Sequence, residues 1–240
     1  MNIAIIFGGG VGARFSRSGT PKQFVELYGK PIIAYTLEQF STNPLIDEIV
    51  IPCVSGWEEY LERIIGQFHI GKRCHIVSGG ATSHESRLNA MHFINDRFPD
   101  ARVIILHDAV RPLVSQDNIT NIVKGALAHG AAVSYVPMTE TPAETTDFEK
   151  LSAVHKRSKH IIIKAPQAFS FAEAYEAHTN VEGLPEDILI DSCTLMAHHG
   201  KKIHLVESTH DNIKITTAKD YFIFKALIDE RHYEVIFGMH

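Results

Sequence analysis

Short apolar segments alternate with amphipathic ones along the first 137 residues. The apolar segments are rich in Ile and Val, which is typical of buried strands, and apolar positions at helical spacing follow them. This pattern predicts strands at 3–7, 47–54, 74–78, 102–106 and 131–137, and helices at 32–40, 57–68, 83–98 and 115–128. Alternation of this kind gives a mostly parallel sheet with helices on both faces.

The pattern changes after residue 137. Residues 138–164 are mostly polar with an apolar end at 161–163, which predicts a hairpin-like β-arm at about 138–165. Helices at 171–178, 191–199 and 218–231 and a strand at 202–206 are expected beyond it. With no internal repeat or low-complexity linker, we expect residues 1–240 to form one α/β, Rossmann-like domain with a protruding arm.

Composition narrows the functional classes. A net charge of −5 without any Lys/Arg-rich run argues against nucleic-acid binding. The apolar runs are too short to cross a membrane, and the N-terminus lacks the features of a signal peptide. The three cysteines show no C-x-x-C spacing and indicate free thiols in a reducing compartment. We therefore expect a cytoplasmic protein without nucleic-acid or membrane partners.

A glycine-rich turn follows the first strand. Glycines leave backbone N–H groups uncovered, which suits a phosphate, and two cations follow close behind. The residues are Gly8, Gly9, Gly10 and Gly12, then Arg14 and Lys22. The sequence predicts a polyphosphate-binding loop with both cations aimed at the charge.

Other interpretations of this turn remain open. Residues 8–13 fit the loose dinucleotide fingerprint, but no second strand ending in an acidic residue follows at the required distance. The P-loop pattern is absent, because no Gly-Lys-Ser/Thr follows the glycines. The plainest alternative is a tight strand–helix turn with two solvated cations.

Polar side chains follow the ends of two more predicted strands. Gly80 is followed by Ser83 and Ser86, and the buried strand 102–106 leads to Asp108 and Arg111. Ligands of open parallel sheets bind at these carboxyl ends. Asp108 is a candidate Mg²⁺ ligand beside phosphates, and the alternative is an ion pair with Arg111. The 15 histidines show no metal-site spacing.

Several motifs occur in the order found in a known family. They are Gly-Gly-Gly-x-Gly-x-Arg at 8–14, Pro-Lys-Gln at 21–23, Gly-Lys-Pro-Ile at 29–32, Gly-Gly at 79–80, His-Asp-Ala-Val-Arg-Pro at 107–112, Pro-Gln-x-Phe at 166–169 and Asn-Ile-Lys-Ile-Thr at 212–216. Together they resemble the cytidylyltransferases of the methylerythritol phosphate and ribitol 5-phosphate type, and more closely the ribitol 5-phosphate branch.

This resemblance implies transfer of a cytidylyl group from CTP to a polyol phosphate, with release of pyrophosphate. It implies that Arg14 and Lys22 stabilise the transition state. It assigns CTP to Phe7, Gly8, Gly9, Gly10, Gly80, Ala81, Ser83, Ser86, Asp108 and Ala109, with Mg²⁺ on Asp108. It assigns the acceptor to Arg111, Thr141, Arg157 and Lys214. It also implies a homodimer in which the arm reaches the neighbouring active site.

The sequence departs from the family pattern at three positions. Ser83 replaces an arginine, and Ala165 and Ile190 each replace a threonine. The last two positions lie near the polyol in the family. The sequence therefore leaves three candidate acceptors, namely ribitol 5-phosphate, methylerythritol phosphate and another sugar phosphate. A nucleotide-binding regulatory relative and a dehydrogenase are the alternatives outside this activity.

Overall fold

The computed structural model of the chain describes residues 1–8 and 19–237. Within these residues seven strands form one sheet in the order β11-β7-β10-β6-β1-β4-β5. They are β1 (Asn2–Phe7), β4 (Glu48–Cys53), β5 (Cys74–Ser78), β6 (Val103–Asp108), β7 (Ala131–Pro137), β10 (Ile161–Ser170) and β11 (His204–Glu207). The paired strands are parallel except where β10 meets β6 and β7. The predicted mostly parallel sheet is confirmed.

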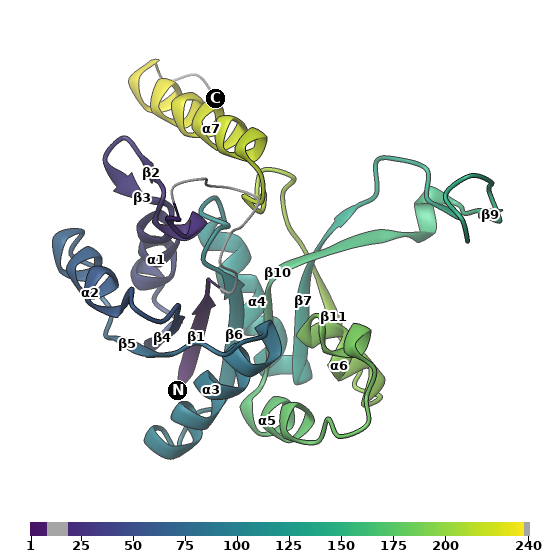
Figure 1. Cartoon of the computed structure of the whole chain (residues 1–240), viewed down its shortest axis with the longest axis horizontal. Helices are drawn as coiled ribbons and strands as arrows, with labels where there is room; N and C mark the ends of the chain where they lie inside the picture. The colour runs from purple at the N-terminus through teal and green to yellow at the C-terminus, as the bar shows by residue number, and fades with distance from the viewer. Residues whose placement is uncertain (9–18, 238–240) are drawn as a thin grey trace.

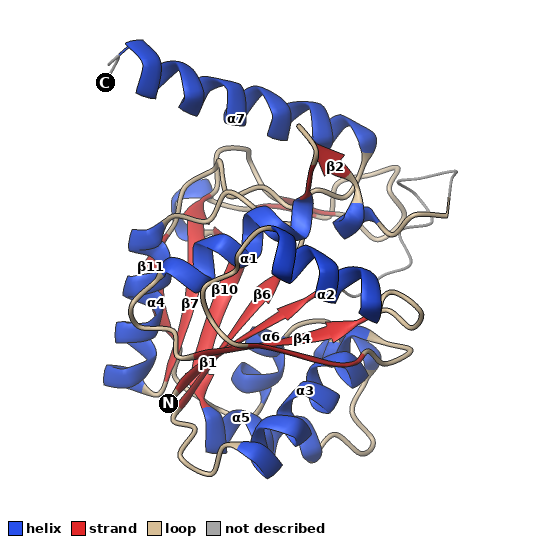
Figure 2. Ribbon diagram, turned by 90° about the vertical axis from the view of Figure 1, so that its left-hand side faces the viewer, coloured by secondary structure: helices blue, strands red, loops and turns tan. Residues whose placement is uncertain are grey.

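Helices cover both faces of this sheet, as Figure 2 shows. One face carries α1 (Ile32–Thr42), α2 (Glu58–Gln67) and α4 (Gln116–His129), and the other carries α3 (Ser83–Arg97), α5 (Phe171–Thr179) and α6 (Ser192–His198). Along β1, Ala4 and Ile6 pack under the first set of helices, whereas Ile3 and Ile5 pack under the second. Because successive side chains of a strand face opposite ways, a strand buried on both faces is apolar throughout.

Strand β10 differs from the sequence-based expectation. Residues 161–163 were assigned to the arm, but they begin a strand that runs into the centre of the sheet, between β6 and β7. Pro166 lies within it, and the pairing with β7 shifts register between Lys164 and Gln167. Such an irregularity accommodates a residue that lacks an N–H for the ladder.

The arm protrudes from the body of the molecule (Figure 1). It contains the short strands β8 (Ala143–Glu144) and β9 (Ala153–Val154), which pair antiparallel, and the 3₁₀ turn η2 (Arg157–Lys159). Phe148 is 95% exposed near its tip, and Leu151 and Val154 are exposed as well. The arm therefore exposes three large apolar side chains.

The remaining elements pack around the carboxyl end of the sheet. They are the 3₁₀ turn η1 (Lys22–Phe24), the hairpin β2 (Glu26–Leu27) and β3 (Lys30–Pro31), the 3₁₀ turn η3 (Glu186–Leu189) and the last helix, α7 (Ala218–Phe237). Phe224 of α7 is fully buried in an apolar cluster with Leu27 and Ile215. Of the helices in the described ranges, none is both long and apolar enough to span a bilayer.

A buried histidine joins α5 to α6 and makes stability depend on pH. The His178 ring lies 3.0 Å from Ser192 Oγ, and burial, with the nearby Arg87 and His84, holds its pKa well below 6.5. Between that pKa and the unfolded value the unfolded chain binds more protons, so stability falls as pH drops below about 6.5, by up to ~1.4 kcal/mol per pH unit. Urea unfolding at pH 7 and pH 5 should show a smaller pH difference for His178→Gln than for the wild type or for His210→Gln, which alters an exposed ring. Equal pH differences in all three proteins would contradict the assignment.

Candidate active site

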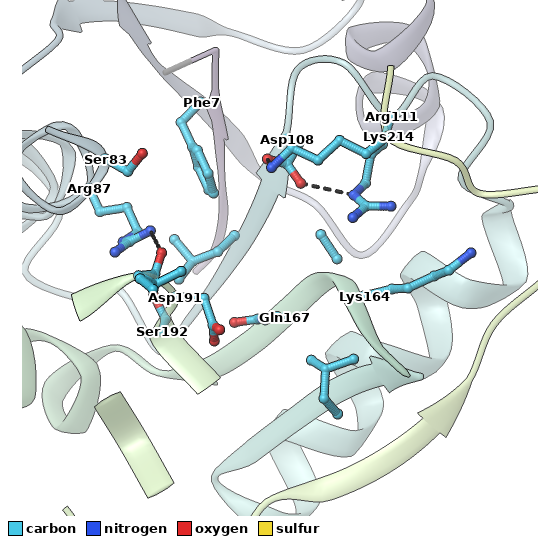
Figure 3. Close-up of a pocket in the computed structure, with 14 residues that line it drawn as sticks. Phe7, Ser83, Arg87, Asp108, Arg111, Lys164, Gln167, Asp191, Ser192 and Lys214 are labelled. Carbon is cyan, nitrogen blue, oxygen red and sulfur yellow. Dashed lines mark hydrogen bonds and ion pairs between the residues drawn. The ribbon is translucent and has the colours of Figure 1, made fainter. Parts of the chain in front are cut away.

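Two adjoining cavities lie where the strands β1, β4, β5 and β6 end. The first, here called the glycine cavity, measures about 400 Å³ and is lined by Gly8, Pro52, Cys53, Val54, Ser55, Gly79, Gly80, Ala81, Thr82, Ser83 and Ser86. The second, here called the β6 cavity, measures about 190 Å³ and is lined by Phe7, Ser83, Arg87, Leu106, Asp108, Arg111, Ile163, Lys164, Ala165, Gln167, Ile190, Asp191, Ser192 and Lys214. Ser83 belongs to both walls, so the two cavities meet there. Figure 3 shows the β6 cavity with Ser83 in its wall.

The turn before α3 shapes the glycine cavity. Thr82 and Glu85 form a capping box, and Gly80 donates its N–H to Ser86 Oγ at 2.9 Å. A Cβ on Gly80 would lie 2.2 Å from the Glu85 Cβ, and one on Gly79 would lie 2.7 Å from a backbone carbonyl oxygen. Glycine is therefore required at both positions, because the turn packs against α3 at Gly80 and against the end of β4 at Gly79.

Gln23 ties the segment that carries Lys22 to the end of β1. Its side chain is 2% exposed and donates from Nε2 to the Gly8 carbonyl oxygen at 3.2 Å. Lys22, predicted as a catalytic cation, therefore begins a turn that is fixed to the start of the glycine loop. The predicted site residues Gly9, Gly10 and Arg14 lie outside the described residues.

Asp108 stands at the end of β6 between two cations. Its Oδ1 lies 2.6 Å from Lys214 Nζ and its Oδ2 lies 2.9 Å from Arg111 Nε. Burial raises the pKa of Asp108, but the two cations outweigh burial and hold the pKa at about 2. The carboxylate is thus charged at neutral pH, and the ion pair with Arg111, one of the two sequence interpretations, is present.

Asn212 holds three segments together beneath these charges. Its carbonyl oxygen accepts hydrogen bonds from Arg111 Nη1 at 3.0 Å and Lys164 Nζ at 3.3 Å, and its side-chain amide donates to the Ala165 carbonyl oxygen at 2.7 Å. It is 1% exposed. Asn212 thereby fixes the segment that carries Lys214, which accounts for the Asn-Ile-Lys motif. No motif in the sequence pointed to Lys164 as a site residue.

The opposite wall of the β6 cavity comes from α3 and the start of α6. Asp191 caps α6 by accepting from the Thr194 N–H at 3.0 Å, and Gln167 Oε1 accepts from the Cys193 N–H at 3.0 Å. Arg87 projects from α3 toward this region (Figure 3). Sequence reasoning missed Arg87, because an arginine on a helix ordinarily faces solvent.

The structure brings most of the predicted site residues to the two cavities. Phe7, Gly8, Gly80, Ala81, Ser83, Ser86, Asp108, Arg111 and Lys214 line one or both of them. Ala109 lines neither: it is fully buried, and its N–H donates to the Phe7 carbonyl oxygen. Thr141 and Arg157 line neither cavity and lie on the arm, where Arg157 Nη1 donates to the Thr139 carbonyl oxygen at 2.8 Å.

A metal ion here would need ligands from a substrate. In the described part of the chain no group of three or more His, Cys, Asp or Glu side chains has the arrangement of a metal site. Asp108 offers a charged carboxylate at the rim of the β6 cavity, and Mg²⁺ often takes one or two carboxylates together with phosphate oxygens and water. Each Asp108 oxygen already contacts a cation, so a Mg²⁺ ion here would share this carboxylate with Lys214 or Arg111 and would take its other ligands from phosphate and water.

Comparison with known proteins identifies the family of this chain. The model of the 2-C-methyl-D-erythritol 4-phosphate cytidylyltransferase (IspD) family matches residues 2–230. The chain belongs to this family. The resemblance seen in the motifs is confirmed, and so is the expected enzyme class, a cytidylyltransferase.

Similar proteins cover the whole chain. A ribitol-5-phosphate cytidylyltransferase of Vibrio parahaemolyticus is 40% identical over 238 residues, which is 99% of this chain and 100% of that protein. One of Streptococcus agalactiae serotype III is 38% identical and covers 100% of both chains. A 2-C-methyl-D-erythritol 4-phosphate cytidylyltransferase of Clostridium acetobutylicum is 32% identical over 95% of this chain and 97% of its own.

A solved structure supports the fold of this cytidylyltransferase. The 4-diphosphocytidyl-2C-methyl-D-erythritol synthase of Anaerococcus prevotii superposes with a TM-score of 0.82 at 21% identity, covering 95% of this chain and 96% of that one. At this identity the match establishes the shared α/β architecture.

Proposed function

We propose that this cytidylyltransferase transfers a cytidylyl group from CTP to ribitol 5-phosphate, giving CDP-ribitol and pyrophosphate. Three relatives named for ribitol 5-phosphate are 37–40% identical to it over at least 99% of the chain. The structural observation that carries the proposal is the junction at Ser83 of a glycine-lined cavity with a cavity rich in cations. A nucleotide in the glycine cavity and a phosphorylated acceptor in the β6 cavity would lie next to each other, and we place the reaction in the cytoplasm, where CTP is available.

The reaction requires two anions to approach each other. An oxygen of the acceptor phosphate attacks the α-phosphorus of CTP, the new P–O bond forms, and the bond to the β-phosphate oxygen breaks as pyrophosphate leaves. The acceptor is already anionic, so no strong base is needed, and catalysis consists of alignment and charge stabilisation. Lys22 and Arg14 at the glycine loop are the cations we assign to the triphosphate.

We assign the acceptor to the β6 cavity. Arg111, Lys164 and Lys214 supply positive charge along one wall, and positive charge favours a bound phosphate. We further propose that the protein is a homodimer, in which the arm of each copy contributes Thr141 and Arg157 to the active site of the other. The exposed apolar residues of the arm are consistent with this role.

We propose that Asp108, together with the phosphates of CTP, holds Mg²⁺. When bound there, the ion supplies positive charge that offsets the charge on the phosphates. Asp108 then has two tasks, because it also keeps Arg111 and Lys214 in place along the acceptor wall.

The acceptor is tested by pyrophosphate release with CTP and Mg²⁺. Ribitol 5-phosphate should support the highest kcat/KM among ribitol 5-phosphate, 2-C-methyl-D-erythritol 4-phosphate, xylitol 5-phosphate and ribose 5-phosphate. A higher value with methylerythritol phosphate would instead favour the activity named for the family model and for the Clostridium acetobutylicum relative. CTP binding without turnover of any acceptor would contradict the proposed class and favour a nucleotide-binding relative.

The glycine cavity gives a separate prediction about CTP. Gly80→Ala would place a Cβ 2.2 Å from the Glu85 Cβ, so the turn must shift. We expect KM for CTP to rise about 10-fold or more, equivalent to ~1.4 kcal/mol of binding energy. Gly71→Ala is the matched control, since a Cβ there meets nothing within 4 Å. An unchanged KM for CTP in Gly80→Ala would place the nucleotide elsewhere.

A further inference from the structure

Arg87 is a buried cation within the wall of the β6 cavity. The residue is 2% exposed, although it lies on a surface helix. Its Nη2 donates to the Leu189 carbonyl oxygen at 2.6 Å and its Nη1 to the Ile190 carbonyl oxygen at 3.3 Å. The buried Nε has no hydrogen-bond partner. Among the residues that the structure describes, no carboxylate forms an ion pair with this guanidinium within 4.0 Å.

The surroundings of Arg87 leave its charge only partly compensated. Burial lowers the pKa of Arg87 to about 10, while Asp191 and Asp108 act in the opposite direction from a distance. Arg87 is therefore charged at neutral pH. Burial, reinforced by Arg87, also lowers the pKa of His84 and His178, so these neighbouring rings stay neutral.

Keeping such a cation in place is costly unless a ligand completes its environment. Burial of a charge without a close counter-ion is unfavourable, and a buried N–H without an acceptor adds to that cost. A guanidinium also has more N–H donors than two carbonyl oxygens satisfy. The remaining donors of Arg87 belong to a side chain that lines the cavity, as Asp191 does.

The position of Arg87 indicates which part of an acceptor it meets. Figure 3 shows Arg87 on the opposite side of the cavity from Lys164 and Lys214, with Asp191 and Gln167 on its own side. A phosphate held at the lysine side would direct the rest of the molecule toward Arg87. Asp191 and Gln167 are already fixed by hydrogen bonds to the first turn of α6, so this side is prearranged to bind polar groups.

We propose that Arg87 determines acceptor specificity by donating hydrogen bonds to the hydroxyl end of the acceptor, opposite its phosphate, with Asp191 accepting from the same end. The ligand class is a phosphorylated open-chain polyol whose terminal hydroxyl lies next to a second hydroxyl. This inference rests on the proposed function and adds the residue that recognises the hydroxyl end of the acceptor. No bond is made or broken at Arg87, so it is a specificity residue and not a catalytic one.

A substrate–enzyme cycle tests this assignment. Wild type, Arg87→Met and Arg87→Lys are each assayed with CTP and either ribitol 5-phosphate or 1-deoxyribitol 5-phosphate, which lacks the terminal hydroxyl. Loss of a hydrogen bond to a charged donor should lower kcat/KM of the wild type by about 10–100-fold for the deoxy acceptor. Arg87→Met should discriminate less than about 3-fold between the two acceptors. Its KM for CTP should stay within about 2-fold of wild type, since the guanidinium is assigned to the acceptor alone.

The controls separate recognition from a structural role. If Arg87 served only to hold the 186–190 segment, its loss would slow both acceptors by the same factor and leave discrimination intact, which would overturn the proposal. Arg87→Lys keeps a cation and should retain part of the discrimination, and Arg97→Met, at the exposed end of the same helix, should behave as wild type. Calorimetric binding of the two acceptors gives the same comparison for a variant that folds but does not turn over. Failure of the wild type to release pyrophosphate with any polyol phosphate would instead reject the proposed function, and this inference with it.

Discussion

Replacing Lys22 by alanine is expected to lower kcat for pyrophosphate release by about 10²–10³-fold, the usual cost of removing one group that stabilises transition-state charge. Lys22 begins the turn η1, which Gln23 fixes to the Gly8 carbonyl at the start of the glycine loop. The turn that carries Lys22 is therefore held beside the loop to which the triphosphate is assigned, although Lys22 lines neither cavity. Because charge builds up between the phosphates during transfer, the loss should appear mainly in kcat and less in KM for CTP.

The lysine at position 124 supplies the control for this experiment. Lys124 is an exposed lysine on α4, and Lys124→Ala removes the same side chain from a helix that carries none of the predicted site residues. Steady-state kinetics of both variants, with thermal unfolding as a check on folding, decide the matter. Lys22→Ala with wild-type kcat would refute electrostatic catalysis by this cation.

Asp108→Asn should have a comparable effect on activity and should also change the response to Mg²⁺. The substitution keeps the shape of the side chain and removes the charge that faces both Arg111 and Lys214. We expect kcat/KM to fall by about 10²-fold or more. The Mg²⁺ concentration for half-maximal rate should rise by at least the roughly 10–100-fold that follows loss of an outer partner of a metal ligand.

The free energy of unfolding reports the structural role of Asp108 separately from its proposed role in binding Mg²⁺. Breaking a buried ion pair costs about 3–5 kcal/mol, and the partial exposure of Lys214 favours the lower end of that range. Glu173→Gln provides the comparison, because it removes the carboxylate of a surface pair with Lys201 and should leave the Mg²⁺ titration unchanged. If Asp108→Asn is destabilised but its Mg²⁺ titration is unchanged, the carboxylate has a structural role and does not bind Mg²⁺.

The parallel part of the fold could be predicted because its strands are buried on both faces. The apolar run 3–7 and the buried run 102–106 became β1 and β6, which pair along their whole length. Strand β10 could not be predicted in the same way. Pro166 argues against a central strand, and only the register shift beside it, a property of the assembled sheet, makes the position tolerable.

The residues of the candidate site also include some that could be predicted from sequence and some that could not. Gly80, Ser83 and Asp108 could be placed together from sequence because the carboxyl ends of parallel strands meet at one edge of the sheet. Arg87 could not, because its burial depends on a loop about a hundred residues away in sequence that packs over α3. Local patterns carry no information about such long-range contacts.

The central position of β10 also determines when the sheet closes during synthesis. The two sheet neighbours of β7, namely β10 and β11, both follow it in the chain, and β6 gains its second neighbour only with β10. A nascent chain that has emerged from the ribosome up to about residue 160 therefore presents an unpaired β7 and an open edge of β6. Open strand edges recruit other chains, so chaperone capture of translation intermediates should persist until Ser170 has emerged.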